Sequence, residues 1–246
     1  MQHGRISHCI RDVVVHLFDR GRSIAREHSM SNNILNPAAD LARNGRIENL
    51  FSTPLFSYIF NDVAVLNAQL RDLILERERT TKSAQKSNIG GWQSDVDFLS
   101  WGGDAVATLG RYMSSAVEAA TRQLPLVTPG LQIGFELVAW AAVSRKGDYN
   151  ASHVHPLSTW SGVYYVDPGD EPSSGFGGAL EFEHPVQSMV MNFFPGLLPS
   201  TLCVRPKAGL IVLFPSSLVH NVRVYQGERP RVCVPFNALT QVVPSE

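Results

Sequence analysis

Three of the eight histidines in this sequence stand where they could bind one metal ion. His153 and His155 form an H-x-H pair, and His220 follows about 65 residues later at the end of an apolar segment. Residues two apart on a strand point to the same face, so the pair predicts two imidazoles on one side. A third imidazole from a separate strand would leave the opposite side of the ion open. Iron that activates oxygen needs such open positions.

Arg231, in the same part of the chain, is a second candidate for a functional residue. It follows His220 by 11 residues and opens a predicted strand with alternating apolar residues. A charge at the head of such a strand must be paired, because an unpaired buried charge is costly. The planar guanidinium can hold a carboxylate through two hydrogen bonds. We therefore expect Arg231 to form either an ion pair at the rim or a site for the acid group of a ligand.

These residues belong to a longer set of motifs. The set comprises 50–55 (LFSTPL), 87–94 (SNIGGWQS), 153–156 (HVHP), 161–166 (SGVYYV), 178–182 (GALEF), 209–216 (GLIVLFPS) with His220, and Arg231 with Phe236 and Asn237. With them the chain resembles a small bacterial and phage family of 2-oxoglutarate/Fe(II) oxygenases that carries an H-x-H-P…S-G-V-Y-Y-V signature. The resemblance extends over about residues 49–240. It implies a double-stranded β-helix, a jelly-roll variant related to the cupins.

The resemblance also implies roles for individual residues. Fe(II) would be bound by His153, His155 and His220. The co-substrate 2-oxoglutarate would be bound by Arg231, Tyr165, Ser161 and Asn237. The implied activity is that of a dioxygenase and hydroxylase: O2 and 2-oxoglutarate are consumed, succinate and carbon dioxide are released, and a C–H bond of an unidentified substrate is hydroxylated.

The predicted ligand set departs from the usual site, in which a carboxylate accompanies two histidines. Asp148, Glu181 or Glu183 could donate that carboxylate, with one histidine of the pair moved out of contact with the ion. We expect three histidine ligands. The alternative function is a cupin-like three-histidine metalloprotein, either a 2-oxoglutarate-independent dioxygenase or isomerase, or a ligand sensor.

Four residues are candidates for the mouth of the substrate site, namely Asn88, Trp92, Gln93 and Trp160. The two tryptophans fit core packing at least as well, because large aromatic side chains are usually buried. We expect a small-molecule or peptide substrate. The formal net charge of −1 gives no general attraction to nucleic acid.

The hydrophobic pattern of the sequence predicts a mainly β fold with flanking helices, and these elements would position the residues above. Apolar residues at helical spacing predict helices at about 62–79 and 104–123, packed outside the barrel. Strands are predicted at 132–144, 160–167, 178–183, 201–205, 209–214, 219–225 and 231–238, after an edge strand at 50–60. A partner chain could cover that edge strand in a homodimer.

The rest of the sequence indicates where the domain begins and in which compartment the protein is found. We expect residues 1–48 to be a loosely ordered extension, of which 1–29 are dispensable, and residues 49–246 to form one domain. The three cysteines are widely spaced and odd in number, which favours a reducing, cytoplasmic compartment over a disulfide framework. No apolar run has the length of a transmembrane helix.

Overall fold

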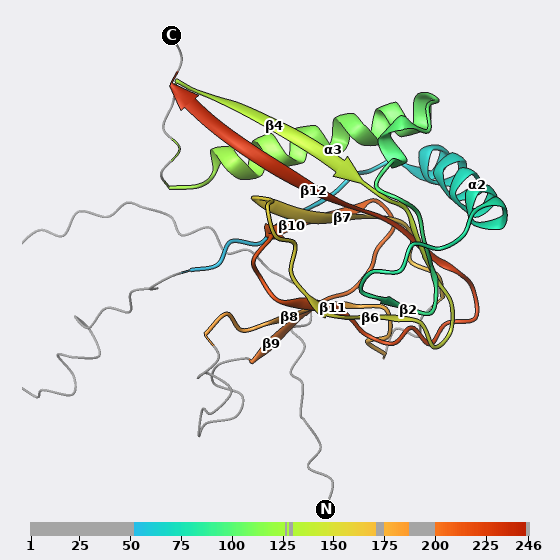
Figure 1. Ribbon diagram of the computed structural model, residues 1–246. Helices are drawn as coiled ribbons and strands as arrows, with labels where there is room; N and C mark the ends of the chain where they lie inside the picture. The colour runs from blue at the N-terminus through green and yellow to red at the C-terminus, as the bar shows by residue number, and fades with distance from the viewer. Residues whose placement is uncertain (1–51, 126, 128–129, 171–174, 187–199, 245–246) are drawn as a thin grey trace, which may run out of the picture. The chain divides into compact units, whose positions relative to one another are not determined.

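The alternating apolar segments of the second half of the chain form two antiparallel sheets (Figure 1). The computed structural model describes residues 52–125, 127, 130–170, 175–186 and 200–244. The predicted extension at 1–48 lies outside this part of the chain. The larger sheet has the strand order β1-β10-β7-β12-β5-β3, with β4 paired to β12, and the smaller sheet has the order β2-β6-β11-β8-β9.

Seven strands make up the larger sheet: β1 (Phe56–Ile59), β3 (Trp92–Gln93), β4 (Leu131–Ala139), β5 (Ala142–Ser144), β7 (Trp160–Asp167), β10 (Leu210–Pro215) and β12 (Arg231–Pro244). Five strands make up the smaller sheet: β2 (Asn88–Ile89), β6 (Tyr149–His153), β8 (Leu180–Glu183), β9 (Thr201–Val204) and β11 (His220–Val222). The helices are α2 (Ala64–Thr80), α3 (Asp104–Arg122) and the short 3₁₀ helix η1 (Phe98–Ser100). The predicted class, mainly β with flanking helices, is confirmed.

The two predicted helices cover one face of the larger sheet (Figure 1). The apolar stripe of α3 is buried there, with Leu109, Met113 and Val117 fully covered. Leu70 and Ile74 of α2 join the same apolar cluster. The opposite face of the larger sheet looks toward the smaller sheet. Because both of its faces are covered, β7 is buried from Trp160 to Val166.

Several strands differ from the sequence prediction. The segment expected as one strand at 132–144 is divided into β4 and β5, because the backbone amides of Trp140 and Ala141 bond to Pro235 O and Ser94 Oγ. Strands β2 and β3 were not predicted, and β6, which was implied by the H-x-H pair, ends at His153. Strand β12 continues to Pro244 because its second half pairs with β4. Within the described residues, neither helix has an apolar stretch of the length that crossing a bilayer requires.

Candidate metal centre

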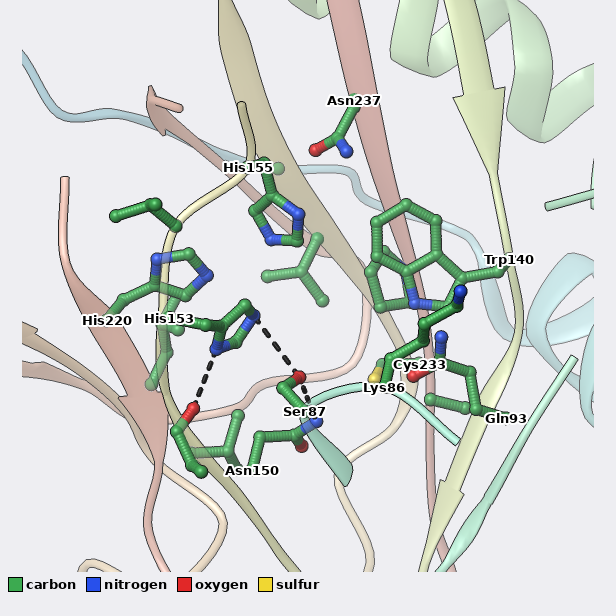
Figure 2. A pocket seen from close by; sticks show the side chains of 18 of the residues that line it. Lys86, Ser87, Gln93, Trp140, Asn150, His153, His155, His220, Cys233 and Asn237 are labelled. Atoms are coloured by element: carbon green, nitrogen blue, oxygen red, sulfur yellow. Dashed lines mark hydrogen bonds between the residues drawn. The ribbon is translucent and has the colours of Figure 1, made fainter. Parts of the chain in front are cut away.

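His153, His155 and His220 meet at one point between the two sheets (Figure 2). His153 ends β6 and lies directly opposite His220, the first residue of β11. The ring centroids are 4.3 Å apart for His153 and His220, 4.9 Å for His153 and His155, and 5.2 Å for His155 and His220. One nitrogen of each ring lies within 4.8 Å of the others. Among the described residues, this is the one cluster of potential metal ligands that meets this spacing.

His155 reaches the cluster by a different route from the one predicted. Strand β6 ends at His153, so His153 and His155 do not share a strand. The chain turns away after the strand, and the backbone amide of His155 donates a hydrogen bond to Ser216 O at 2.9 Å. The two rings therefore converge because β6 stops between them and the following turn is fixed to the end of β10.

Backbone carbonyls orient two of the three rings. Nδ1 of His153 lies 2.7 Å from Ala151 O, and Nδ1 of His220 lies 2.8 Å from Leu218 O. A carbonyl oxygen only accepts hydrogen bonds, so each Nδ1 must carry the proton and each Nε2 keeps a lone pair. Holding the non-ligating nitrogen in this way fixes the tautomer and the direction of a metal-binding imidazole.

Burial keeps the three imidazoles neutral. Desolvation lowers the pKa of His220 to about 3 and that of His155 to about 4, with the neighbouring histidines adding to both shifts. The pKa of His153 is also lowered by burial. A neutral imidazole is the form that binds a metal ion, so the cluster is competent as a ligand set at neutral pH.

None of the three carboxylates considered as alternatives joins the cluster. Glu181 is paired with Arg223 at 2.6 Å. Glu183 accepts a hydrogen bond from Ser152 Oγ at 2.9 Å, and Asp148 accepts one from the Arg145 amide at 2.6 Å. Leu180 and Phe182, which alternate with the two glutamates along β8, are the residues that point into the core. In the described part of the chain, the cluster therefore consists of histidines alone.

A cavity of about 630 Å³ adjoins the histidine cluster. This volume lies within the range of about 300–1,000 Å³ that is typical of small-molecule sites. Its wall is largely apolar and includes Trp140, whose ring centroid is 5.7 Å from that of His155. Figure 2 shows the histidines on one side of this space and Trp140 on the other.

Arg231 and Tyr165 line the same cavity, and both are buried. The guanidinium carbon lies 5.2 Å from the centroid of the tyrosine ring, and Nη1 donates to Cys233 Sγ at 3.5 Å. Neither Arg231 Nε nor Tyr165 Oη has a hydrogen-bond partner, and no carboxylate among the described residues pairs with Arg231. The ion pair at the rim considered for Arg231 is not formed there.

The Tyr165 hydroxyl remains protonated at neutral pH. Burial is the main cause that raises its pKa, to about 12. A protonated phenol can donate a hydrogen bond to an incoming carboxylate, beside a permanently charged guanidinium. The pair thus offers two unused donors, of the kinds that bind an acid group.

Of the two other residues expected at the 2-oxoglutarate site, one faces the cavity. Asn237 lines it, whereas Ser161 does not. Ser161 Oγ instead donates to Asn237 Oδ1 at 2.8 Å. Ser161 therefore contacts a residue of the cavity wall and is not itself part of that wall.

Of the four residues expected at the substrate mouth, only Gln93 lines the cavity. Trp92 and Trp160 belong to the core on the helix side of the sheet, where Trp160 Nε1 donates to Thr121 Oγ1 at 3.0 Å. The Asn88 side chain bonds within its own loop, accepting from the Lys86 amide at 2.9 Å. Placing the two tryptophans at the mouth is not supported, because they pack on the opposite face of the sheet.

Sequence reasoning assigned no role at the site to three polar residues beside the cluster, although Ser87 begins the motif at 87–94. Ser87 Oγ lies 3.3 Å from His153 Nε2 and accepts a hydrogen bond from Asn150 Nδ2 at 3.1 Å. Lys86 lines the cavity next to Ser87. No spacing in the sequence marks these residues, because their loop reaches the site only through the pairing of β2 with β6.

Known proteins match this part of the chain. Residues 138–237 match a family model described as "Putative 2OG-Fe(II) oxygenase", and this segment contains all three histidines and Arg231. This segment is therefore similar to the domain of 2OG-Fe(II) oxygenases. The match is to a family of oxidoreductases, and it covers the segment that holds the histidine cluster. No curated protein matches the sequence.

Solved structures show the same fold in this oxygenase domain. A prolyl-4-hydroxylase from Pseudomonas putida superposes with a TM-score of 0.53 at 19% identity, covering 81% of this chain and 94% of its own. A prolyl hydroxylase from Trichoplax adhaerens, in complex with a hypoxia inducible factor peptide fragment, gives 0.53 at 14% identity, with coverage of 82% and 86%. HygX from Streptomyces hygroscopicus, with nickel and 2-oxoglutarate bound, gives 0.51 at 14%, with coverage of 76% and 82%. The predicted double-stranded β-helix is confirmed.

Proposed function

We propose that this oxygenase is an Fe(II)- and 2-oxoglutarate-dependent dioxygenase that hydroxylates a small-molecule substrate. One observation carries the proposal: Arg231 Nε and the Tyr165 hydroxyl, two buried donors without an acceptor, lie on the wall of the same cavity as three convergent, neutral histidines. The cavity volume of about 630 Å³ suits a small substrate beside the co-substrate.

The histidines fit an iron ion that keeps open positions. The lone pair of His153 and of His220 is on Nε2, because each Nδ1 proton is donated to the carbonyl of Ala151 or Leu218. An ion bound to His153 Nε2 would displace the contact with Ser87 Oγ at 3.3 Å. The three rings approach from the smaller sheet and the adjoining turn, so the remaining side of the ion would face the cavity. Imidazole is a suitable ligand for iron, and the open side is where co-substrate and oxygen would bind.

Arg231 and Tyr165 fit the far carboxylate of 2-oxoglutarate. Arg231 Nε and the Tyr165 hydroxyl are buried donors without acceptors, an arrangement that is unfavourable until an anion arrives. A carboxylate would accept hydrogen bonds from both groups and neutralise the guanidinium. Asn237, oriented by Ser161, adds an amide to the same wall.

Bound iron and 2-oxoglutarate supply the oxidising chemistry, in which one oxygen atom of O2 enters succinate with loss of carbon dioxide and the other enters a substrate C–H bond. The residues of this chain bind and orient the reactants. Val163, Leu180 and Phe214 line the cavity beside them and exclude water from the reacting groups.

The decisive experiment is anaerobic titration of the purified protein with Fe(II) and 2-oxoglutarate. We expect a weak visible charge-transfer band, followed by succinate formation when oxygen is admitted. The Arg231→Leu variant should need more 2-oxoglutarate to develop the same band. Absence of the band together with absence of 2-oxoglutarate consumption would contradict the proposal.

The cupin-like alternative is favoured by one observation, the all-histidine cluster without a carboxylate in the described part of the chain. In that case Arg231 would bind an acid group of the substrate itself. Oxygen consumption with a carboxylic substrate in the absence of 2-oxoglutarate would support this second function over the first.

A further inference from the structure

The cavity wall has an uneven charge. Among the described residues that line it, two are cationic, Arg231 and Lys86, and none is an aspartate or glutamate. In the proposed function, Arg231 is occupied by 2-oxoglutarate. The proposed function gives Lys86 no role, and Lys86 has no ion-pair partner among the residues that the structure describes. A wall with spare positive charge and no negative charge favours an anionic ligand.

Lys86 lies near the residues that face the histidines across the cavity. Figure 2 shows Lys86 with Gln93 and Trp140 on one side of the view, and His153 and His220 on the other. A molecule that reaches from Lys86 to the histidines would therefore pass along Trp140. It would have its reacting end at the metal and its charged end at the rim.

The backbone that carries Lys86 is fixed to the strand that carries His153. The Lys86 amide donates to Asn88 Oδ1 at 2.9 Å, and the Ala151 amide of β6 donates to Ser87 O at 2.9 Å. Ser87 Oγ also accepts the bond from Asn150. Because β6 ends at His153, these hydrogen bonds connect the segment that carries Lys86 to the strand that carries a histidine of the cluster.

The space between these two ends is bordered by apolar surface. Trp140 lines it, and Val96 and Val154 line it with 60% and 41% of their surface exposed. Exposed apolar side chains at the rim of a cavity are typical of a binding surface. The wall thus combines a cationic end with an apolar middle.

We propose that the substrate is an amphipathic anion, whose negative group binds Lys86 and whose apolar body lies against Trp140. That this anion is the substrate of a hydroxylation rests on the proposed function. That it binds at Lys86 does not. Gln93, next to Lys86 on the cavity wall, offers a neutral amide to the same group.

Binding of matched acids and amides tests this inference directly. The probes are phenylacetate, 3-phenylpropionate and 4-phenylbutyrate, each compared with its uncharged amide. Calorimetry is performed on the full chain loaded with Zn(II) and saturating 2-oxoglutarate, so that Arg231 is already occupied. We expect at least one acid to bind about fivefold or more tightly than its amide, a ratio typical of a charge-assisted contact near the surface.

Two lysine variants provide the comparison. Lys86→Ala should weaken binding of that acid about fivefold and abolish the difference between acid and amide. Lys82→Ala is the matched control, because Lys82 is an exposed lysine of the same loop that does not line the cavity. It should bind acid and amide as the unmodified protein does. Acids that bind no more tightly than their amides, or an unchanged preference in Lys86→Ala, would overturn the inference.

The same titrations separate this inference from the proposed function. A protein that binds the acids through Lys86 but never consumes 2-oxoglutarate would retain the inference and lose the proposed function. If Lys86→Ala instead weakens 2-oxoglutarate binding and leaves the acids unaffected, Lys86 serves the co-substrate and the inference is wrong.

Discussion

Tyr164 and Tyr165 are neighbours on β7, both fully buried, yet they lie on opposite faces of the larger sheet. On the helix face, the Tyr164 hydroxyl donates to Asn67 Oδ1 of α2 at 2.8 Å. On the cavity face, the Tyr165 hydroxyl has no partner and lies close to Arg231. The hydroxyl on the helix face is satisfied within the fold, and the one on the cavity face is not.

Strand β12 shows the same division. Val232, Val234 and Phe236 belong to the core on the helix side. Arg231 and Asn237, on the alternate positions, line the cavity. A buried donor without an acceptor lowers the stability of the folded protein, so such donors are expected mainly at functional sites. We accordingly assign the helix face to the stability of the fold and propose that the cavity face binds ligands.

The largest effect is expected from removing a ligand on the cavity face. His220→Ala should reduce bound iron and lower 2-oxoglutarate turnover on the order of 100-fold, because one of three ligands is lost. Metal analysis together with a succinate assay measures both quantities. His184→Ala, which changes a histidine outside the cluster, should retain both. Full iron loading in His220→Ala would contradict the ligand assignment.

Arg231→Leu should act on the co-substrate rather than on the metal. Loss of the charge-assisted hydrogen bonds should raise the KM for 2-oxoglutarate about 30-fold, equivalent to about 2 kcal/mol, with iron content unchanged. Arg231→Lys keeps the charge but loses the planar guanidinium, so its KM for 2-oxoglutarate should lie between those of the unmodified protein and Arg231→Leu. An unchanged KM in the leucine variant would show that 2-oxoglutarate binds elsewhere.

The two tyrosines offer a matched pair of smaller changes. Tyr164→Phe should lower the free energy of unfolding by about 1 kcal/mol, because Asn67 loses its partner, and should leave the KM for 2-oxoglutarate unchanged. Tyr165→Phe should alter stability by less than about 0.5 kcal/mol and raise that KM about fivefold. Chemical denaturation and steady-state kinetics distinguish the two. The reverse pattern would mean that the two faces have been assigned the wrong way round.

The smallest effect concerns the stability of the metal-free protein as a function of pH. Burial lowers the pKa of His155 to about 4 and that of His220 to about 3, from an ordinary value of 6.5. Between pH 6.5 and about 4 the unfolded chain therefore binds more protons than the folded one, and stability falls as the pH falls. Denaturant midpoints in the presence of a chelator measure this. The slope of unfolding free energy against pH should be smaller in His220→Gln. An unfolding free energy that does not change with pH in the unmodified protein would contradict the burial of neutral histidines.

Local pattern in the sequence predicts much of this molecule. The apolar period of 104–123 places Leu109, Met113 and Val117 on one buried stripe, because 3.6 residues per turn leave no other face for them. The alternation of 231–238 separates the core face from the cavity face of β12, because side chains alternate along a strand. The chemistry of the candidate site follows from residue types alone, since imidazoles suit iron and guanidinium suits a carboxylate.

Contacts between distant segments decide the rest. The period of a strand does not show where the strand stops, so the position of His155 beyond β6 depends on its bond to Ser216. Whether Arg231 has a carboxylate partner depends on every element packed around it, and the described elements provide none. Lys86 reaches the cavity only because β2 pairs with β6. Sequence by itself determined which groups could react and which residues of β12 alternate between its two faces. Tertiary structure decided which of the reactive groups meet, because burial and pairing are properties of the packed chain.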